Sequence, residues 1–190
     1  MFETLEQWDS ELFVFLNSLG IEQFDGFWIF ATKIESWTLL FGFFIFLIFY
    51  YYKGKKGVLV FSFGLCTFLI TLLFTELTKD FIARLRPNNV AEFSGLIRIL
   101  QSPNSYSFFS GHASSSFAIT TFLVLVLRNF NKWIFLAYLW PLVFSLSRIY
   151  VGVHYPGDIL VGALVGTGFA IISYKLYRTA EFKIFQKASY

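Results

Sequence analysis

The sequence predicts an all-α integral membrane protein, a helical bundle of five or six transmembrane helices with an N-terminal interfacial helix. Of its 190 residues, 56% are hydrophobic and 22% are aromatic, and the mean hydropathy is +0.63. Charged residues make up only 14% of the chain, against about 25% in a typical soluble domain. A soluble fold of this length cannot hide so much apolar surface, whereas lipid covers the outer surface of a membrane protein.

The apolar residues gather in blocks that polar loops separate. Five blocks indicate membrane spans: residues 36–52, 58–78, 108–127, 133–147 and 159–177. The first block ends in three tyrosines, Tyr50 to Tyr52, as expected of an aromatic belt at a membrane surface. The last block carries Gly162, Gly166 and Gly168, small residues that permit close helix packing.

The N-terminal segment, residues 4–16, is amphipathic. Apolar residues recur along it at helical spacing: Leu5, Trp8, Leu12 and Leu16. The segment is too polar to span a bilayer, so we expect a helix in the membrane interface with Trp8 facing lipid. The alternative for residues 10–32 is a short true span, from about residue 12 to residue 32. Four polar or small residues interrupt that span: Asn17, Gly20, Glu22 and Asp25.

Basic residues indicate which side of the membrane each loop faces. The loops 53–57 and 128–132 share one side with the C-terminal tail, and all three are basic, so we expect that side to be cytoplasmic. The loops 79–107 and 148–157 share the opposite side. The acidic N-terminus is the wrong sign for a cleavable signal peptide. The net charge of +3 is small and no basic tract is present, so no nucleic-acid partner is expected.

Three clusters of polar residues interrupt the apolar pattern. They are Lys79 to Pro87, Phe109 to His112, and Ser147-Arg148 followed by His154 and Asp158. The first cluster follows the second span, the second opens the third span, and the third connects the last two spans. Alternation of the spans places all three on one side of the membrane, so residues far apart in sequence are expected to meet there.

The cations of these clusters suit a phosphate group. Arginine offers a planar fork that matches phosphate oxygens, and lysine offers a point charge, so Lys79, Arg86 and Arg148 are candidate phosphate ligands. Ser110 and Gly111 stand where a helix begins, and the free amides and dipole of a helix start favour an anion. The alternatives are cations that extend toward lipid headgroups and a serine that only caps its helix.

The two histidines suit phosphoryl transfer. Asp158 follows His154 by four residues and is expected to accept the Nδ1–H of that ring, which leaves Nε2 free to attack phosphorus. His112 is then the acid that protonates the leaving group. Taken singly, each histidine could be structural and Asp158 a simple helix cap. Two histidines and Asp158 could also hold zinc, but three neighbouring cations repel a divalent ion, so no metal is expected.

In these clusters the sequence resembles the type-2 phosphatidic acid phosphatase superfamily, which includes bacterial phosphatases of lipid carriers and the vanadium haloperoxidases. The superfamily pattern is a lysine followed after six residues by Arg-Pro, then Pro-Ser-Gly-His, then Ser-Arg, five residues, His, three residues and Asp. Lys79 to Pro87 and Ser147 to Asp158 match in full, and Phe109 replaces the usual proline of the middle motif. The resemblance covers about residues 79–175.

The resemblance implies a metal-independent membrane lipid phosphatase without cofactors, formed by one membrane-embedded domain over residues 1–190. His154 would attack phosphorus and form a phosphohistidine, Asp158 would orient it, and His112 would protonate the departing group. Five residues would hold the phosphoryl oxygens: Lys79, Arg86, Ser110, Gly111 and Arg148.

The expected substrate is a lipid phosphate or diphosphate, with undecaprenyl diphosphate favoured over lipid A phosphates, phosphatidylglycerol phosphate and phosphatidic acid. Remoter alternatives are a vanadate-dependent haloperoxidase, whose known relatives are largely soluble, and a non-enzymatic lipid-binding membrane protein. The expected location is the bacterial inner (cytoplasmic) membrane, with membrane lipids as neighbours and the active site facing the periplasm or outside. Oligomeric state is not predicted.

Overall fold

The structure, a computed structural model, describes residues 2–186, and that part of the chain contains helices and no strands. The α-helices are α1 (Phe2–Ser18), α2 (Asp25–Ala31), α3 (Thr38–Tyr51), α4 (Gly54–Ile82), α5 (Gly111–Leu127), α6 (Leu139–Tyr150) and α7 (Pro156–Glu181). Short 3-10 helices join them at Glu22–Phe24, Ile34–Trp37, Pro87–Asn89, Ala91–Phe93 and Lys132–Tyr138, and a π-helical turn covers Phe182–Gln186. The predicted all-α fold is confirmed.

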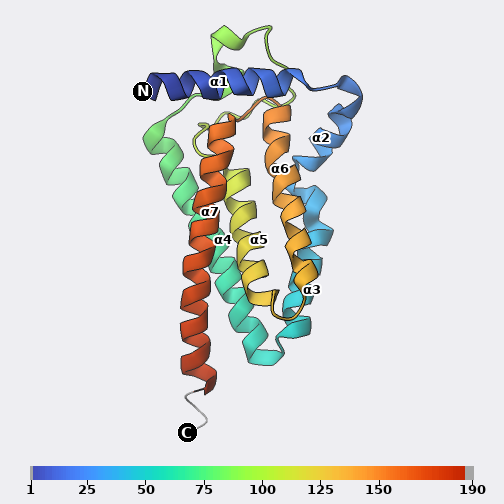
Figure 1. The fold of residues 1–190 in the computed structure, drawn as a ribbon, viewed down its shortest axis with the longest axis vertical. Coiled ribbons are helices and arrows are strands. Elements are labelled where there is room, and N and C mark those ends of the chain that lie inside the picture. Colours follow the sequence, from blue (N-terminus) through green and yellow to red (C-terminus); the bar gives the residue numbers. More distant parts are fainter. Residues whose placement is uncertain (1, 187–190) are drawn as a thin grey trace.

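The predicted spans correspond to the upright helices of the bundle (Figure 1). Among residues 2–186, four helical stretches are long and apolar enough to cross a membrane: Ile34–Tyr51, Gly54–Phe93, Lys132–Tyr150 and Pro156–Phe185. The fifth span is α5, a shorter apolar helix of 17 residues. The chain is therefore a membrane protein with the helix number that its apolar blocks predict.

Helix α5 is the centre of the bundle. It packs against α4, α6 and α7, and most of its residues are buried on all sides. Several buried residues are serine, alanine or threonine, which let neighbouring backbones come close. Ser110 begins the helix as its N-cap, because its side chain accepts a hydrogen bond from the Ala113 amide at 3.4 Å. The helix therefore places its amino end, which carries the middle motif, between the other helices.

The closest helix contact joins α5 and α7 through two of the three predicted packing glycines. A Cβ atom at Gly166 would overlap the carbonyl oxygen of Ser114, and one at Gly162 would lie 2.7 Å from that of Ser110. The prediction for Gly168 is wrong, because nothing lies within 4 Å of the corresponding position. Glycines spaced by four residues share a helix face, whereas Gly168 points away from α5.

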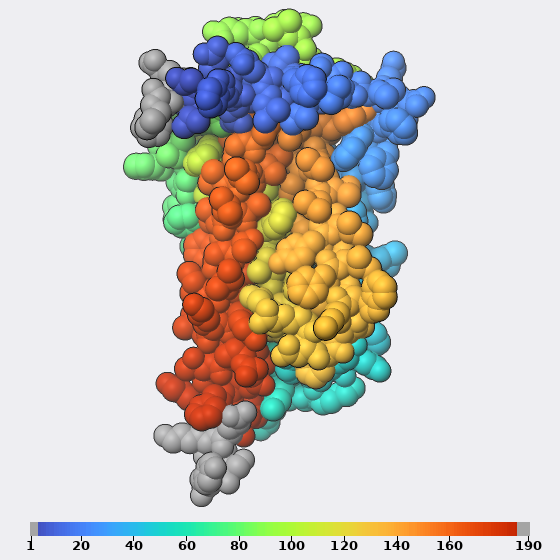
Figure 2. Space-filling model, viewed as in Figure 1, coloured from blue at the N-terminus to red at the C-terminus, as the bar shows by residue number. Residues whose placement is uncertain are grey.

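The N-terminal segment forms a helix, as predicted, and α1 lies across one end of the bundle rather than along it (Figure 1). Its outward residues are exposed and apolar: Leu5, Trp8, Leu12 and Phe15. In Figure 2, α1 and part of the loop between α4 and α5 cover this end of the molecule. The alternative of a single span over residues 12–32 is wrong, because the chain turns after Ser18 and α2 contains only seven residues.

Asn17 fixes the end of α1 to the bundle. Its buried amide donates to the carbonyl oxygens of Arg98, Ile149 and Tyr150 at 3.0–3.2 Å, and its oxygen accepts the Arg98 amide at 2.7 Å. Arg98 in turn holds Asp25 of α2 through two contacts of 2.7 Å. These bonds join α1, α2, α6 and the long loop into one covering layer over the end of the bundle.

Replacing Gly166 with alanine is expected to destabilise the protein by about 2 kcal/mol, because the new methyl group must push α5 and α7 apart. Gly168→Ala is the matched control on the same helix. It meets no neighbour and should leave stability unchanged or raise it by about 0.5–1 kcal/mol, since alanine favours a helix more than glycine does. Thermal unfolding in detergent measures both variants, and equal melting temperatures for them would contradict the packing account.

Candidate active site

The three polar clusters meet at the end of the bundle that α1 covers (Figure 1). Lys79 lies in the last turn of α4, His112 in the first turn of α5, and Arg148 near the end of α6. Most of the predicted site residues are almost completely buried: Lys79, Arg86, Ser110, Arg148, His154 and Asp158. The predicted convergence of distant segments is therefore present.

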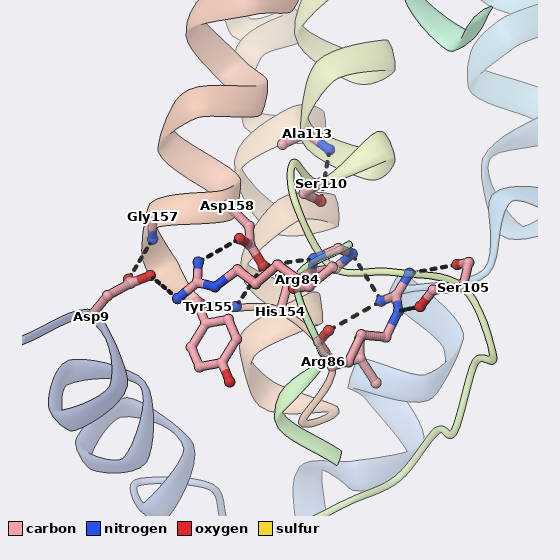
Figure 3. Close-up of polar contacts among 12 residues, drawn as sticks. Asp9, Arg84, Arg86, Ser105, Ser110, Ala113, His154, Tyr155, Gly157 and Asp158 are labelled. Carbon is pink, nitrogen blue, oxygen red and sulfur yellow. Dashed lines mark hydrogen bonds and ion pairs between the residues drawn. The ribbon is translucent and has the colours of Figure 1, made fainter. Parts of the chain in front are cut away.

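His154 and Asp158 form the pair that their spacing predicts (Figure 3). The Nδ1 atom of His154 lies 3.1 Å from Oδ2 of Asp158. The carboxylate can only accept, so Nδ1 carries the hydrogen and Nε2 is the unprotonated nitrogen. The same oxygen accepts the Tyr155 amide at 3.1 Å, so Asp158 caps α7 as well as orienting the ring. The hydroxyl of Ser107 also donates to this oxygen.

Arg86 faces the other side of the His154 ring (Figure 3). Its Nη1 lies 3.0 Å from Nε2 of His154 and donates to the carbonyl oxygen of Val153 at 3.0 Å. Its remaining nitrogens donate to the backbone oxygen and hydroxyl of Ser105 at 2.6 and 3.0 Å. Since a guanidinium can only donate, Nε2 must accept, and its lone pair points at Arg86.

Arg148 and His112 meet at Thr32, the residue that follows α2. The guanidinium of Arg148 donates to the Thr32 hydroxyl and, at 2.8 Å, to the side-chain oxygen of Gln101. Nε2 of His112 donates to the Thr32 carbonyl at 3.2 Å, and the ring stacks on Phe144 at 4.5 Å. Among residues 2–186, the buried Nε of Arg148 has no hydrogen-bond partner.

Lys79 and Gly111 are neighbours, as their shared predicted role requires. A methyl group at Gly111 would lie 3.6 Å from the Lys79 ammonium nitrogen. That nitrogen also contacts a carboxylate oxygen of Glu76, an exposed side chain, at 2.7 Å. Ser110 has the capping role that was left open as its alternative, and its amide donates to the Asp158 carbonyl at 3.0 Å. Gly111, the first residue of α5, thus lies next to a cation.

Arg84 and Asp9 are charged residues of the site that were not predicted. Arg84 contacts Asp158 at 2.7 Å and Asp9 at 2.9 Å. Arg84 stands two positions before Arg86, so the motif itself was a signal. Asp9 offered none, because it lies in an acidic N-terminal helix. The uncharged residues of the site also gave no signal, because such residues are common in loops. They are Thr32, Gln101, Ser105 and Ser107.

Burial controls the charge of His154. Loss of water contact lowers the pKa of its imidazole to about 3, because protonation would place a charge in an apolar interior. The positive charges of Arg86 and Arg148 lower this pKa further, while Asp158 opposes them. The ring is therefore neutral at pH 7, as a nucleophile must be.

A neutral imidazole that a carboxylate orients, beside three buried cations and the amino end of a helix, defines an anion site suited to phosphoryl transfer in a polytopic membrane protein. The chain belongs to the PAP2 superfamily, whose family model matches residues 57–182. The match includes the three polar clusters and helices α4 to α7 almost completely. The protein is therefore a membrane-embedded phosphatase of this superfamily.

Two similar proteins have names that refer to lipid substrates. The chain is 29% identical over 179 residues to a lipid A 4'-phosphatase of Porphyromonas gingivalis, with 91% of this chain and 74% of that protein covered. It is also 29% identical over 174 residues to an undecaprenyl-diphosphatase of Sulfolobus acidocaldarius, with 91% and 80% covered.

Solved structures with the same fold come from two bacteria. The PAP2-type phosphatidylglycerolphosphate phosphatase of Bacillus subtilis superposes with a TM-score of 0.70 at 20% identity, covering 95% of this chain and 88% of that one. LpxE of Aquifex aeolicus superposes with a TM-score of 0.66 at 27% identity, covering 87% and 93%. The first likeness extends over nearly the whole chain, and the second over most of it.

Acid is expected to destabilise the fold through His154. The pKa of the ring is about 3 in the folded chain and near 6.5 when unfolded, so between these values the unfolded chain binds more protons. The free energy of unfolding therefore falls as the pH drops from about 6.5 toward 3. Melting temperatures between about pH 7 and pH 4.5 should fall more steeply for the parent than for His154→Gln. Parallel pH dependences would contradict the buried neutral imidazole.

Proposed function

We propose that this membrane phosphatase is a metal-independent lipid phosphatase that removes a terminal phosphate through a phosphohistidine on His154. The observation that carries the proposal is the arrangement around that ring. Asp158 holds Nδ1, Arg86 faces Nε2, and the other phosphate-binding cations lie in the same buried cluster. Such an arrangement pairs a nucleophile with ligands for the group that it attacks.

The present partners of the buried cations are groups that a phosphate can replace. Arg86 and Arg148 donate mainly to neutral oxygens of Ser105, Gln101 and Thr32. Neutral partners satisfy hydrogen bonds but do not compensate a buried positive charge, so a phosphate dianion improves the balance. Lys79 can exchange the exposed Glu76 for the same anion. The amides at the start of α5 add donors of the kind that binds phosphate at helix termini.

The chemical steps follow from these contacts. Nε2 of His154 attacks phosphorus when Arg86 turns from that nitrogen to a phosphoryl oxygen, and the bond to the leaving oxygen breaks. His112 gives a proton to this oxygen, while Asp158 stabilises the positive charge that develops on the phosphorylated ring. Water then attacks the phosphohistidine, His112 takes up a proton from it, and inorganic phosphate and free His154 result. The Thr32 carbonyl holds Nε2–H of His112 throughout, so the proton that moves is carried by Nδ1 of a ring that is protonated on both nitrogens.

No metal enters these steps. Within the described part of the chain, no three His, Cys, Asp or Glu side chains gather in an arrangement that could hold one. Lys79, Arg86 and Arg148 supply the positive charge that a divalent ion provides in other phosphatases.

An apolar cavity supports a lipid substrate. It has a volume of about 240 Å³ and lies between α3, α4, α5 and α6, with aromatic side chains dominating its walls. Phe144 lines this cavity and also stacks on His112, so the cavity adjoins the candidate acid. Its apolar walls suit the hydrocarbon chain of a lipid, while the phosphate of that lipid reaches the cations.

We favour undecaprenyl diphosphate as the substrate, because a cavity of this size takes a segment of one chain. Lipid A carries several acyl chains, but two of the similar proteins are named lipid A 4'-phosphatases, which makes a lipid A phosphate the second candidate. Phosphatidylglycerol phosphate and phosphatidic acid present the same terminal group. A panel of these lipids is expected to give the highest kcat/KM for the isoprenoid diphosphate. A clear preference for lipid A would overturn the choice of substrate but leave the phosphatase chemistry intact.

The proposed location is a bacterial inner membrane, with the active site facing the periplasm or outside. The end of the bundle opposite α1 carries the basic turns between α3 and α4 and between α5 and α6. Short basic turns stay on the cytoplasmic side in most membrane proteins, which supports this orientation.

Replacing His154 with alanine is expected to abolish phosphate release, with a loss of at least about 10³-fold in kcat, because no other group can attack. The assay uses purified protein in detergent with a chelator present, so that a metal-dependent activity would be detected as a loss. Turnover by His154→Ala, or a strict metal requirement, would contradict the mechanism. Halide oxidation with added vanadate, or headgroup binding without phosphate release, would identify the haloperoxidase or the binding protein instead.

His112→Ala is expected to slow an alkyl phosphate far more than p-nitrophenyl phosphate. Alkoxide is a poor leaving group that needs a proton, whereas p-nitrophenolate leaves without one. The ratio of the two rates, measured in parent and variant, isolates this role from general damage. An equal loss for both substrates would contradict His112 as the acid.

A further inference from the structure

The carboxylate that orients His154 is itself held on its other side. While Oδ2 of Asp158 faces His154, Oδ1 accepts a hydrogen bond from Nη1 of Arg84 at 2.7 Å. The Arg84 guanidinium also lies over the Tyr155 ring, 3.8 Å from its centroid, which restricts its position further. Rotation of the carboxylate is therefore blocked from both sides, and with it rotation of the bond to His154.

Asp9 of α1 completes this arrangement from outside the PAP2 match (Figure 3). One carboxylate oxygen of Asp9 accepts Nη2 of Arg84 at 2.9 Å, and the other accepts the Gly157 amide at 2.7 Å. Gly157 directly precedes Asp158, so the contacts close a ring from Asp158 through Arg84 and Asp9 back to α7. The close approach needs a small residue, since a Cβ at Gly157 would lie 2.8 Å from the Asp9 carboxylate.

We propose that Asp9 and Arg84 are positioning residues for the phosphoryl transfer, so that helix α1 is a working part of the active site. The inference rests on the proposed function, because it concerns the pair that orients the nucleophile. Neither residue contacts the phosphate ligands Lys79 and Arg148 in the structure, so both act through Asp158. Their loss should lower the rate of the chemical step without weakening phosphate binding.

The charges explain why Arg84 needs Asp9. Asp158 must keep enough negative charge for His154, which becomes positive when it is phosphorylated. An arginine that is also paired with a second carboxylate attracts the charge of Asp158 less strongly than an arginine paired with Asp158 alone. Without Asp9, Arg84 would concentrate its positive charge on Asp158 and compete with His154 for it. The Gly157 amide would also lose its acceptor, which loosens the first turn of α7.

The test compares variants in the intact protein. Asp9→Asn keeps the shape of the side chain and removes the charge. Glu11→Gln is the matched control, because it removes a charge from an exposed residue of the same helix that accepts a hydrogen bond from Gln7. Arg84→Gln removes the clamp, and Arg84→Lys keeps the charge without the fork. Measurements are kcat, KM, the pH dependence of kcat and inhibition by vanadate, which reports the phosphate ligands independently.

The expected kcat falls about tenfold in Asp9→Asn and about a hundredfold in Arg84→Gln, with Arg84→Lys between parent and Arg84→Gln. KM and vanadate inhibition should stay within about twofold, and Glu11→Gln should match the parent. The double variant Asp9→Asn/Arg84→Gln should equal Arg84→Gln, because the asparagine oxygen still accepts the Gly157 amide and the charge of Asp9 acts through Arg84. The limbs of the kcat pH profile should shift in Asp9→Asn, a change that simple loosening of the fold does not produce.

Several results would overturn the inference. They are an unchanged kcat in Asp9→Asn, multiplicative losses in the double variant, or a loss of vanadate inhibition that parallels the loss of rate. His154→Ala separates this failure from failure of the proposed function. If His154→Ala is inactive and Asp9→Asn is not impaired, only the role of α1 is wrong. If His154→Ala is active, the proposed function itself fails.

Discussion

The arrangement of the site depends on one buried carboxylate. Asp158 is completely buried. If its partners were lost, the unpaired charge would lower the free energy of unfolding by about 3–5 kcal/mol. Its donors come from separate parts of the chain: the His154 ring, the Tyr155 amide, the Ser107 hydroxyl and the Arg84 guanidinium. Satisfying this charge therefore fixes the turn between α6 and α7, the long loop and the end of α4 relative to one another. The nucleophile inherits that rigidity.

The sequence predicted the spans and the reacting groups because both leave local signals. Apolar blocks identify helices in lipid, and two histidines among cations stand out in a chain with few charges. The covering layer left no such signal: the amide of Asn17 forms its bonds with residues over eighty positions away, and Asp9 belongs to a generally acidic helix. Gly168 shows a related limit, because composition reveals a small residue but the rotation of its helix decides which neighbour it meets.

The contacts of Arg86 and Lys79 indicate how the protein keeps cations in an apolar setting. Each makes short polar contacts of its own: Arg86 with His154 and Ser105, and Lys79 with Glu76. Such contacts hold the side chains in position and lower the cost of burying them. The groups that make these contacts carry less negative charge than a phosphate dianion, so the phosphate of a substrate can replace them. The same contacts thus hold the cations in position before the substrate binds and give way to its phosphate when it does.

The short length of α5 has a consequence for how a lipid meets the enzyme. A helix of 17 residues is about 26 Å long, whereas the 29 residues of α4 extend about 44 Å. The upper end of α5, where the helix begins, lies lower in the bundle than the upper ends of α6 and α7 (Figure 1). In the proposed mechanism, the scissile bond would therefore lie beneath the layer that α1 forms, near the first turn of α5. A lipid can arrive by lateral diffusion, without being lifted out of its leaflet, and only water and inorganic phosphate need to pass the layer above.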